Sequence, residues 1–251
     1  MFEKRLIPTL LYKDRGFVKT IQFSKPRYIG DPINTLKIFN EKEVDEIAVL
    51  DIDASTKNRG PDFNFIKSIT NECFFPLSYG GGITTIAQIE QIFSLGIEKV
   101  ILNSSLALNP SLTKEAARSF GNQSIVASID VKQSLFGKQA AYTHSGKRKI
   151  NVPLADYVRS VEDLGVGELV ITSINREGTY KGYDLQLIEN VRQLVSIPII
   201  ANGGASNYKE AENVFSLNCS AAAGSIFVYH GPHRSVLINY PERDQLKRIN
   251  Q

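Results

Sequence analysis

Short apolar runs alternate with amphipathic segments along the whole chain. The apolar runs are typical of buried strands, and they cover Leu6–Leu11, Glu46–Asp51, Phe75–Tyr79, Lys99–Asn103, Ile125–Asp130, Leu169–Thr172, Ile197–Ala201 and Ala221–Gly224. Apolar residues at helical spacing predict helices between these strands, over Pro32–Asn40, Phe63–Glu72, Ile86–Leu95, Leu112–Phe120, Leu154–Leu164, Leu185–Leu194 and Ser206–Phe215. Because parallel neighbours need crossover connections, this alternation indicates an all-parallel sheet. Strands flanked by helices throughout favour a closed barrel over an open sheet.

The two halves of the chain resemble each other. Three pairs of segments match in the same order: Ile7–Lys13 with Val126–Lys132, Glu46–Leu50 with Glu168–Thr172, and Pro76–Gly82 with Pro198–Gly204. Convergent strand composition could explain one match but hardly three in register. We therefore predict a single α/β domain over residues 1–251, a (β/α)8 TIM barrel built of two (β/α)4 half-barrels. The length of 251 residues is what one such barrel requires.

Composition narrows the class of protein. Hydrophobic residues make up 42% of the chain and charged residues 22%, as in an ordinary globular enzyme. There is no apolar run of about 18 residues and no apolar segment behind the charged N-terminus, so we expect a cytoplasmic protein with no membrane segment. A net charge of +3 is too small to indicate nucleic-acid binding. The chain has three histidines, His144, His230 and His233, and none is spaced from an acidic residue as metal ligands are. We therefore expect no metal site and no cofactor.

Two glycine clusters each follow a predicted strand and precede a helix. Glycine lets backbone N–H groups approach an anion closely, and a helix N-terminus adds a favourable dipole. A lone glycine pair is more often a tight turn, but here each cluster is paired with a small polar strand end one β/α unit later. The first cradle comprises Gly81, Gly82, Asn103 and Ser104, and the second comprises Gly203, Gly204, Gly224 and Ser225. Two cradles on opposite sides of one rim suit a ligand with a phosphate at each end.

Several motifs together resemble one family. They are Lys4–Pro8, Asp51–Ser55, Gly80–Ile83, Ser128–Asp130, Thr172–Thr179 and Ala201–Ala205. Over residues 1 to about 230 the chain resembles the synthase (cyclase) subunit of imidazole glycerol phosphate synthase, HisF. In that family a partner glutaminase, HisH, makes ammonia that passes through the barrel to the C-terminal rim. There it cleaves and cyclises a bis-phosphorylated substrate into imidazole glycerol phosphate and an aminoimidazole carboxamide ribonucleotide. The resemblance implies a heterodimer with a HisH-type glutaminase.

The resemblance also implies two catalytic carboxylates, at the ends of the first and fifth barrel strands. The second is Asp130, but the first position holds Leu11, which the internal repeat independently places opposite Asp130. Leucine cannot transfer a proton, and losing a general acid or base commonly costs ~10²–10⁴-fold in rate. Core filling is the plain interpretation of Leu11. A structural role for Asp130 is the weaker alternative, since chemistry lies at the C-terminal ends of barrel strands.

Further substrate-binding residues follow from the resemblance at the same rim. Thr172, Glu177 and Gly178 match the loop after the sixth strand, where the family usually has Asp in place of Glu177. Asn202 replaces a usual serine at the second phosphate site. Lys19 matches a substrate-contacting position on the long first loop, residues 12–30, which we expect to be a lid over an anionic ligand.

Four charged residues begin strands at the opposite end of the barrel. Arg5, Glu46, Lys99 and Glu168 match the charged ring that gates ammonia entry in the family. Charges pointing into a barrel are costly unless they pair, and two of each sign can pair fully. A structural ion-pair cluster that merely plugs the barrel is the alternative.

The C-terminal segment, residues 229–251, departs from the family. Gly231, Pro232 and Pro241 interrupt it, so we expect any helix there to be short. This ending and Leu11 resemble paralogues that work with a HisH-like glutaminase and a separate amidotransferase to amidinate sugars of bacterial surface polysaccharides.

Three hypotheses remain open. The first is a HisF-like subunit that conducts ammonia to a sugar amidotransferase. The second is a true cyclase of histidine biosynthesis, in which Glu177, Asp51 or Asp53 replaces the missing acid. The third is the related sugar-phosphate isomerase of the same pathway, which fits least because it also needs the first-strand carboxylate and has no ammonia gate.

Overall fold

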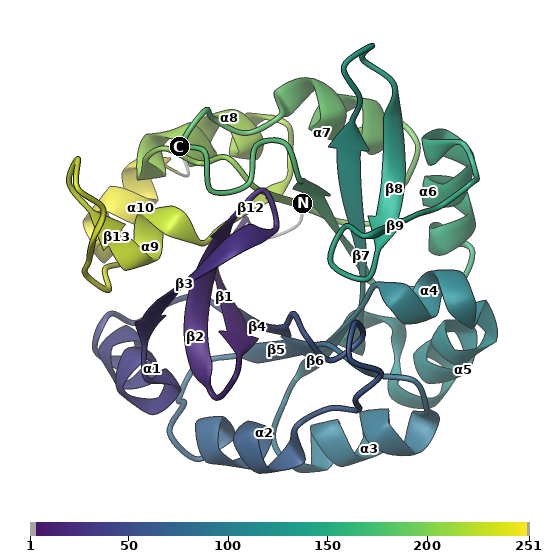
Figure 1. Cartoon of the computed structure of the whole chain (residues 1–251), viewed down its shortest axis with the longest axis horizontal. Helices are drawn as coiled ribbons and strands as arrows, with labels where there is room; N and C mark the ends of the chain where they lie inside the picture. Colours follow the sequence, from purple (N-terminus) through teal and green to yellow (C-terminus); the bar gives the residue numbers. More distant parts are fainter. Residues whose placement is uncertain (1–3, 250–251) are drawn as a thin grey trace.

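The computed structural model describes residues 4–249 and shows a closed barrel of parallel strands (Figure 1). In barrel order the strands are β1 (Leu6–Lys13), β4 (Ile47–Asp51), β5 (Leu77–Gly80), β6 (Lys99–Leu102), β7 (Ile125–Gln133), β10 (Glu168–Ser173), β11 (Ile199–Asn202) and β12 (Ser220–Ala223). Pairing of β12 with β1 and of β7 with β10 closes the ring. The (β/α)8 barrel predicted from the alternating pattern is confirmed.

Helices surround the barrel and bury one face each against the strands (Figure 1). They are α1 (Pro32–Glu41), α2 (Phe63–Thr70), α3 (Ile86–Ser94), α4 (Ser104–Leu108), α5 (Pro110–Phe120), α6 (Leu154–Glu162), α7 (Leu185–Arg192), α8 (Ala211–Ser216) and α9 (Ser225–Val228), with 3-10 turns at Asn122–Ser124 and Tyr208–Glu210. All seven predicted helices are present, and the last begins with the second 3-10 turn. None of the helices in the described part of the chain has the length and apolarity that a bilayer crossing needs.

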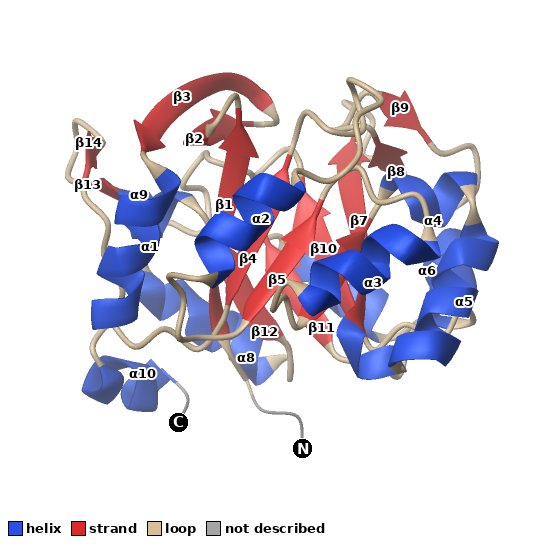
Figure 2. Ribbon diagram, turned by 90° about the horizontal axis from the view of Figure 1, so that it is seen from below, coloured by secondary structure: helices blue, strands red, loops and turns tan. Residues whose placement is uncertain are grey.

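Two antiparallel extensions rise from the C-terminal rim (Figure 2). β2 (Gly16–Ile21) and β3 (Ser24–Gly30) continue from β1, and β8 (Gln139–Thr143) and β9 (Arg148–Lys149) continue from β7. The segment 12–30, expected to be a long loop, is instead mostly strand, because β2 pairs with β1 and β3 with β2. The two extensions follow equivalent strands of the two halves, as the internal repeat requires.

The register shows the repeat at the level of single residues. In the first half Leu11 is level with Leu50, and Leu50 is level with Gly80. In the second half Asp130 is level with Thr172, and Thr172 is level with Asn202. The structure therefore places Leu11 where the second half has Asp130.

The C-terminal segment forms the short hairpin β13 (Tyr229–His230) and β14 (Ser235–Val236) and then the helix α10 (Arg243–Ile249). The helix is short, as expected from the glycine and prolines. Tyr240 lies between β14 and α10 and is only 1% exposed. Its ring stacks on Phe227, and its hydroxyl donates a hydrogen bond of 2.8 Å to the Leu6 carbonyl. This contact ties the end of the chain to its first strand.

Tyr240→Phe removes that donor from a buried carbonyl and is expected to lower the free energy of unfolding by about 1–2 kcal/mol. Tyr240→Ala also leaves a cavity, and the loss should be about 3–5 kcal/mol. Urea denaturation measures both. Tyr28→Phe, at a residue that is 63% exposed, is the control and should change little; an equally small effect at Tyr240 would contradict the tie.

Candidate functional site

Four charged side chains form a closed ring at the N-terminal end of the barrel. Arg5 pairs with Glu46 and, at 2.5 Å, with Glu168. Lys99 Nζ lies 3.1 Å from a carboxylate oxygen of Glu46 and 3.1 Å from one of Glu168. Each charge thus has two partners of opposite sign, and the four side chains are only 5–18% exposed. The structure brings together the four residues that the sequence placed here.

Above the ring lies a small interior cavity, with room for about one water molecule, that Glu46 and Ser78 border from below. Its wall is an apolar cluster of side chains that point into the barrel: Ile7, Ala48, Ile101, Val126, Ile200 and Ala222. Leu50 and Val170 pack against this cluster. Five residues border both this cavity and the larger one at the rim: Thr9, Leu50, Ile101, Ser128 and Asn202. The small cavity above the ring therefore adjoins the rim cavity, and these five residues lie between the two.

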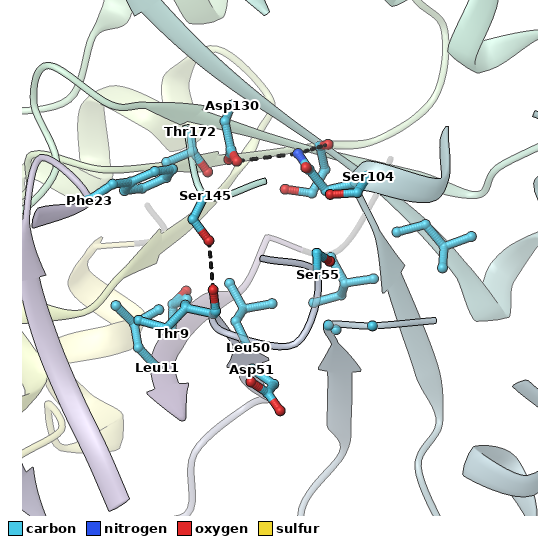
Figure 3. A pocket seen from close by; sticks show the side chains of 18 of the residues that line it. Thr9, Leu11, Phe23, Leu50, Asp51, Ser55, Ser104, Asp130, Ser145 and Thr172 are labelled. Atoms are coloured by element: carbon cyan, nitrogen blue, oxygen red, sulfur yellow. Dashed lines mark hydrogen bonds between the residues drawn. The ribbon is translucent and has the colours of Figure 1, made fainter. Parts of the chain in front are cut away.

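The rim cavity has a volume of about 950 Å³ including its mouth and lies at the C-terminal ends of the strands (Figure 3). The first cradle borders it through Gly81, Gly82, Asn103 and Ser104. Gly81 has φ 126° and Gly82 φ 70°, and an added Cβ would meet the carbonyl oxygen of Asp51 at 2.5 Å or that of Arg59 at 2.4 Å. Only glycine fits here, so the backbone can approach a ligand closely.

Asp130 projects into the rim cavity and is 9% exposed. Its carboxylate accepts a hydrogen bond of 3.3 Å from Asn103 Nδ2. Burial raises the pKa of Asp130 to about 7, Glu177 adds to the effect, and a hydrogen bond from Thr172 opposes it. Among residues 4–249 the aspartate makes no ion pair, so it can exchange a proton near neutral pH.

Leu11 borders the same cavity from the opposite side (Figure 3). The acidic residues that could replace it are held by cations instead. Asp51 pairs with Arg59 at 2.9 Å. Asp53 pairs with Lys13 at 2.8 Å and with Lys57 at 2.6 Å.

Both aspartates also organise their own loop. Asp51 Oδ1 accepts backbone hydrogen bonds from Asp53 and Ala54, although burial raises its pKa. Burial acts in the same direction on Asp53, but the bonds from Lys13 and Lys57 outweigh it and lower its pKa. These interactions give both carboxylates a structural role.

The second cradle does not border the rim cavity. Lys19 is 4% exposed, pairs with Glu177, and packs its side chain against Gly224, where an added Cβ would come 2.7 Å from Cε. Glu177 Oε2 would lie 3.3 Å from a Cβ on Gly203. The structure therefore brings Lys19 to the second cradle, but as a buried partner of Glu177 rather than as a residue on a lid. Gly178, Gly204 and Ser225 lie outside the open cavity as well.

Sequence reasoning missed several side chains of the rim cavity, among them Thr20, Phe23 and Ser145. Thr20 and Phe23 lie on the β2–β3 hairpin, and Ser145 lies in the turn between β8 and β9 and donates to the Ile52 carbonyl at 2.7 Å. The sequence Ser145–Gly146 is a turn signal between two short strands and could have indicated this second extension.

The raised pKa of Asp130 predicts a pH-dependent stability. A buried acid whose folded pKa exceeds its unfolded pKa stabilises the fold at low pH, and this contribution is lost as pH rises from about 4 to about 7. Asp130→Asn removes the ionisation, so its stability relative to the natural chain should rise by about 2–3 kcal/mol between pH 5 and pH 8. Urea denaturation at both pH values tests this. Asp156→Asn, on the surface of α6, is the control; equal pH dependence in both variants would contradict the assignment.

Comparison with known proteins agrees with this arrangement. The profile of the family described as histidine biosynthesis protein matches residues 5–233. A Pseudomonas aeruginosa protein provisionally named imidazole glycerol phosphate synthase subunit hisF2 is 46% identical over 248 residues, covering 98% of this chain and 99% of the relative. The imidazole glycerol phosphate synthase subunit HisF of Petrotoga mobilis is 39% identical over 231 residues, covering 91% and 92%. The chain belongs to the histidine biosynthesis protein family, in which it is similar to HisF subunits.

Proposed function

We propose that this protein is the ammonia-conducting synthase subunit of a glutamine amidotransferase complex. A HisH-type glutaminase docks at the N-terminal end of the barrel, and ammonia passes the charged ring and leaves at the phosphate-binding rim. There it is delivered to an enzyme that amidinates a sugar of a surface polysaccharide. The observation that carries this proposal is the pair of adjoining cavities between an intact ring and the rim, where Asp130 is the one lining carboxylate without an ion pair among the described residues.

The ring and the interior support ammonia transport. A neutral molecule crosses an apolar cavity without the desolvation cost that ammonium would meet. The ion pairs close the entrance when the subunit is alone, and docking of the partner rearranges them. A purely structural plug needs no cavity above it, whereas here the cavity begins directly at Glu46.

The rim supports a change of chemistry from the cyclase. General acid–base catalysis by a pair of carboxylates needs two groups that can exchange protons. Leu11 cannot, and Asp51, Asp53 and Glu177 each have a cationic partner. Asp130 and the first cradle remain available to bind a phosphorylated ligand and to sense ammonia.

The second candidate is cyclase activity in histidine biosynthesis, which forms imidazole glycerol phosphate and an aminoimidazole carboxamide ribonucleotide. The names of the relatives favour it, and so do the retained Asp130 and both glycine cradles. In that case Glu177, released from Lys19 when phosphate binds, would be the acid that takes the place of the missing aspartate.

Ammonium-driven turnover of the family's substrate, phosphoribulosyl-formimino-aminoimidazole carboxamide ribonucleotide, separates the two candidates. We expect negligible turnover by the natural chain and a gain in Leu11→Asp toward the ~10²–10⁴-fold that a missing acid or base costs. Leu11→Asn is the matched control, because asparagine is as large and as polar as aspartate but cannot transfer a proton. Robust turnover by the natural chain would overturn the proposal in favour of the cyclase.

The ring is tested in the reconstituted complex with its glutaminase and the acceptor enzyme. Among the described residues, Lys99→Leu leaves Glu46 and Glu168 with Arg5 as their only cationic partner, so the entrance should no longer direct ammonia inward. We expect more ammonia released to solution per glutamine hydrolysed, with the glutaminase rate unchanged. Lys114→Leu, on the surface of α5, is the control. Unchanged coupling combined with lower stability of Lys99→Leu would identify the ring as a structural plug.

A further inference from the structure

One buried polar atom at the junction of the two cavities has no protein partner. Asn202 is 9% exposed, and its Oδ1 makes no hydrogen bond with any residue that the structure describes. A buried acceptor without a partner costs free energy, commonly about 1–3 kcal/mol. Such an atom therefore marks a place where a small hydrogen-bond donor binds.

The orientation of the Asn202 side chain is set by its neighbours. Asn202 Nδ2 donates a hydrogen bond of 3.2 Å to Thr172 Oγ1. The Thr172 hydroxyl in turn bonds to the carboxylate of Asp130. Because the single hydroxyl proton of Thr172 is given to Asp130, its oxygen must accept from Asn202. This fixes the NH2 group toward Thr172 and leaves the carboxamide oxygen free.

The free oxygen lies on the route from the ring to the rim. Asn202 ends β11 and is one of the five residues that border both cavities, together with Leu50 and Ile101. In the strand pairing, Asn202 on β11 is level with Thr172 on β10, and Thr172 is level with Asp130 on β7. The equivalent positions of the first half, Gly80, Leu50 and Leu11, carry no polar side chain. Polar groups in register thus lead from Asn202 to Asp130, whereas Thr9 is the polar residue of the first half that borders both cavities.

We propose that Asn202 Oδ1 is an ammonia-binding site at the exit of the interior cavity, held in place by Thr172 and directing ammonia toward the side of Asp130. The inference rests on the proposed function, since it assumes that ammonia passes through the barrel. An N–H group of ammonia donates to Oδ1, while the nitrogen lone pair stays available for the reaction at the rim.

The chemistry of the junction selects this ligand. A carboxamide oxygen accepts but cannot donate, so it offers nothing to the oxygens of a phosphate. None of the five residues that border both cavities carries a charge that would offset the cost of desolvating ammonium. A small neutral donor satisfies Oδ1 without either penalty.

The test is a nuclear magnetic resonance titration of the full chain with asparagine labelled in its carboxamide group. Ammonium chloride is added at constant pH above the pKa of ammonium, with potassium chloride at equal ionic strength as reference. We expect a saturable shift of the Asn202 carboxamide resonances, which Asn202→Ser identifies by their loss. The same titration at a pH where only ammonium is present should give no such shift. If the Asn202 resonances do not shift at high pH, or shift equally with ammonium chloride and potassium chloride, only water occupies the site.

Variants of Thr172 test the positioning role. Thr172→Val removes the acceptor for Asn202 Nδ2, so the carboxamide can rotate and the ammonia affinity should fall several-fold. Thr172→Ser keeps the hydroxyl and should restore the natural response. Thr9→Val, which borders both cavities from the first half, is the matched control and should keep it too. Equal affinity in Thr172→Val and the natural chain would overturn the role of Thr172.

The ring variant separates this inference from the function on which it rests. Lys99→Leu should keep the Asn202 response, because dissolved ammonia reaches the junction from the rim. If the natural chain shows no Asn202 response, the ammonia site is overturned, but the proposed passage of ammonia through the ring is not. An intact response together with unchanged coupling in Lys99→Leu overturns transport through the ring instead.

Discussion

Hydrogen bonding between parallel strands around a closed ring determines where the functional side chains of this protein lie. Because all eight strands run in the same direction, the residues that begin them meet at one end and the residues that end them meet at the other. Arg5 and Glu168 are far apart in the chain but adjacent in the ring for this reason. The same register brings Asp130, Thr172 and Asn202 level with one another. Closure by β7 and β10 joins these positions into one interior.

The parts that the sequence predicted are those in which a local pattern reports burial. Strands of a parallel barrel are covered on both faces, so they appear as continuous apolar runs, and all eight were predicted within a few residues of their observed ends. The location of the four charges was predicted for a related reason, because a charge directly before an apolar run lies at the end of the barrel, whereas their arrangement as a ring was implied by the family resemblance.

The parts that escaped prediction depend on contacts between distant segments. Five of the seven residues of β3 are exposed, so its sequence has no apolar alternation, and its strand conformation comes from pairing with β2. Lys19 was predicted to contact substrate from a lid, and its burial follows only when Glu177, 158 residues away, is placed beside it. Asn202 was visible as a departure from the family, but its free oxygen follows only from the positions of Thr172 and Asp130.

The tie between Tyr240 and Leu6 has a consequence for how the protein is made. The first strand to leave the ribosome has one of its two barrel neighbours, β12, near the end of the chain, and the residue that covers its carbonyl comes later still. The barrel therefore cannot close until β12 and Tyr240 have been made, and until then the edge of β1 that pairs with β12 is open to other chains.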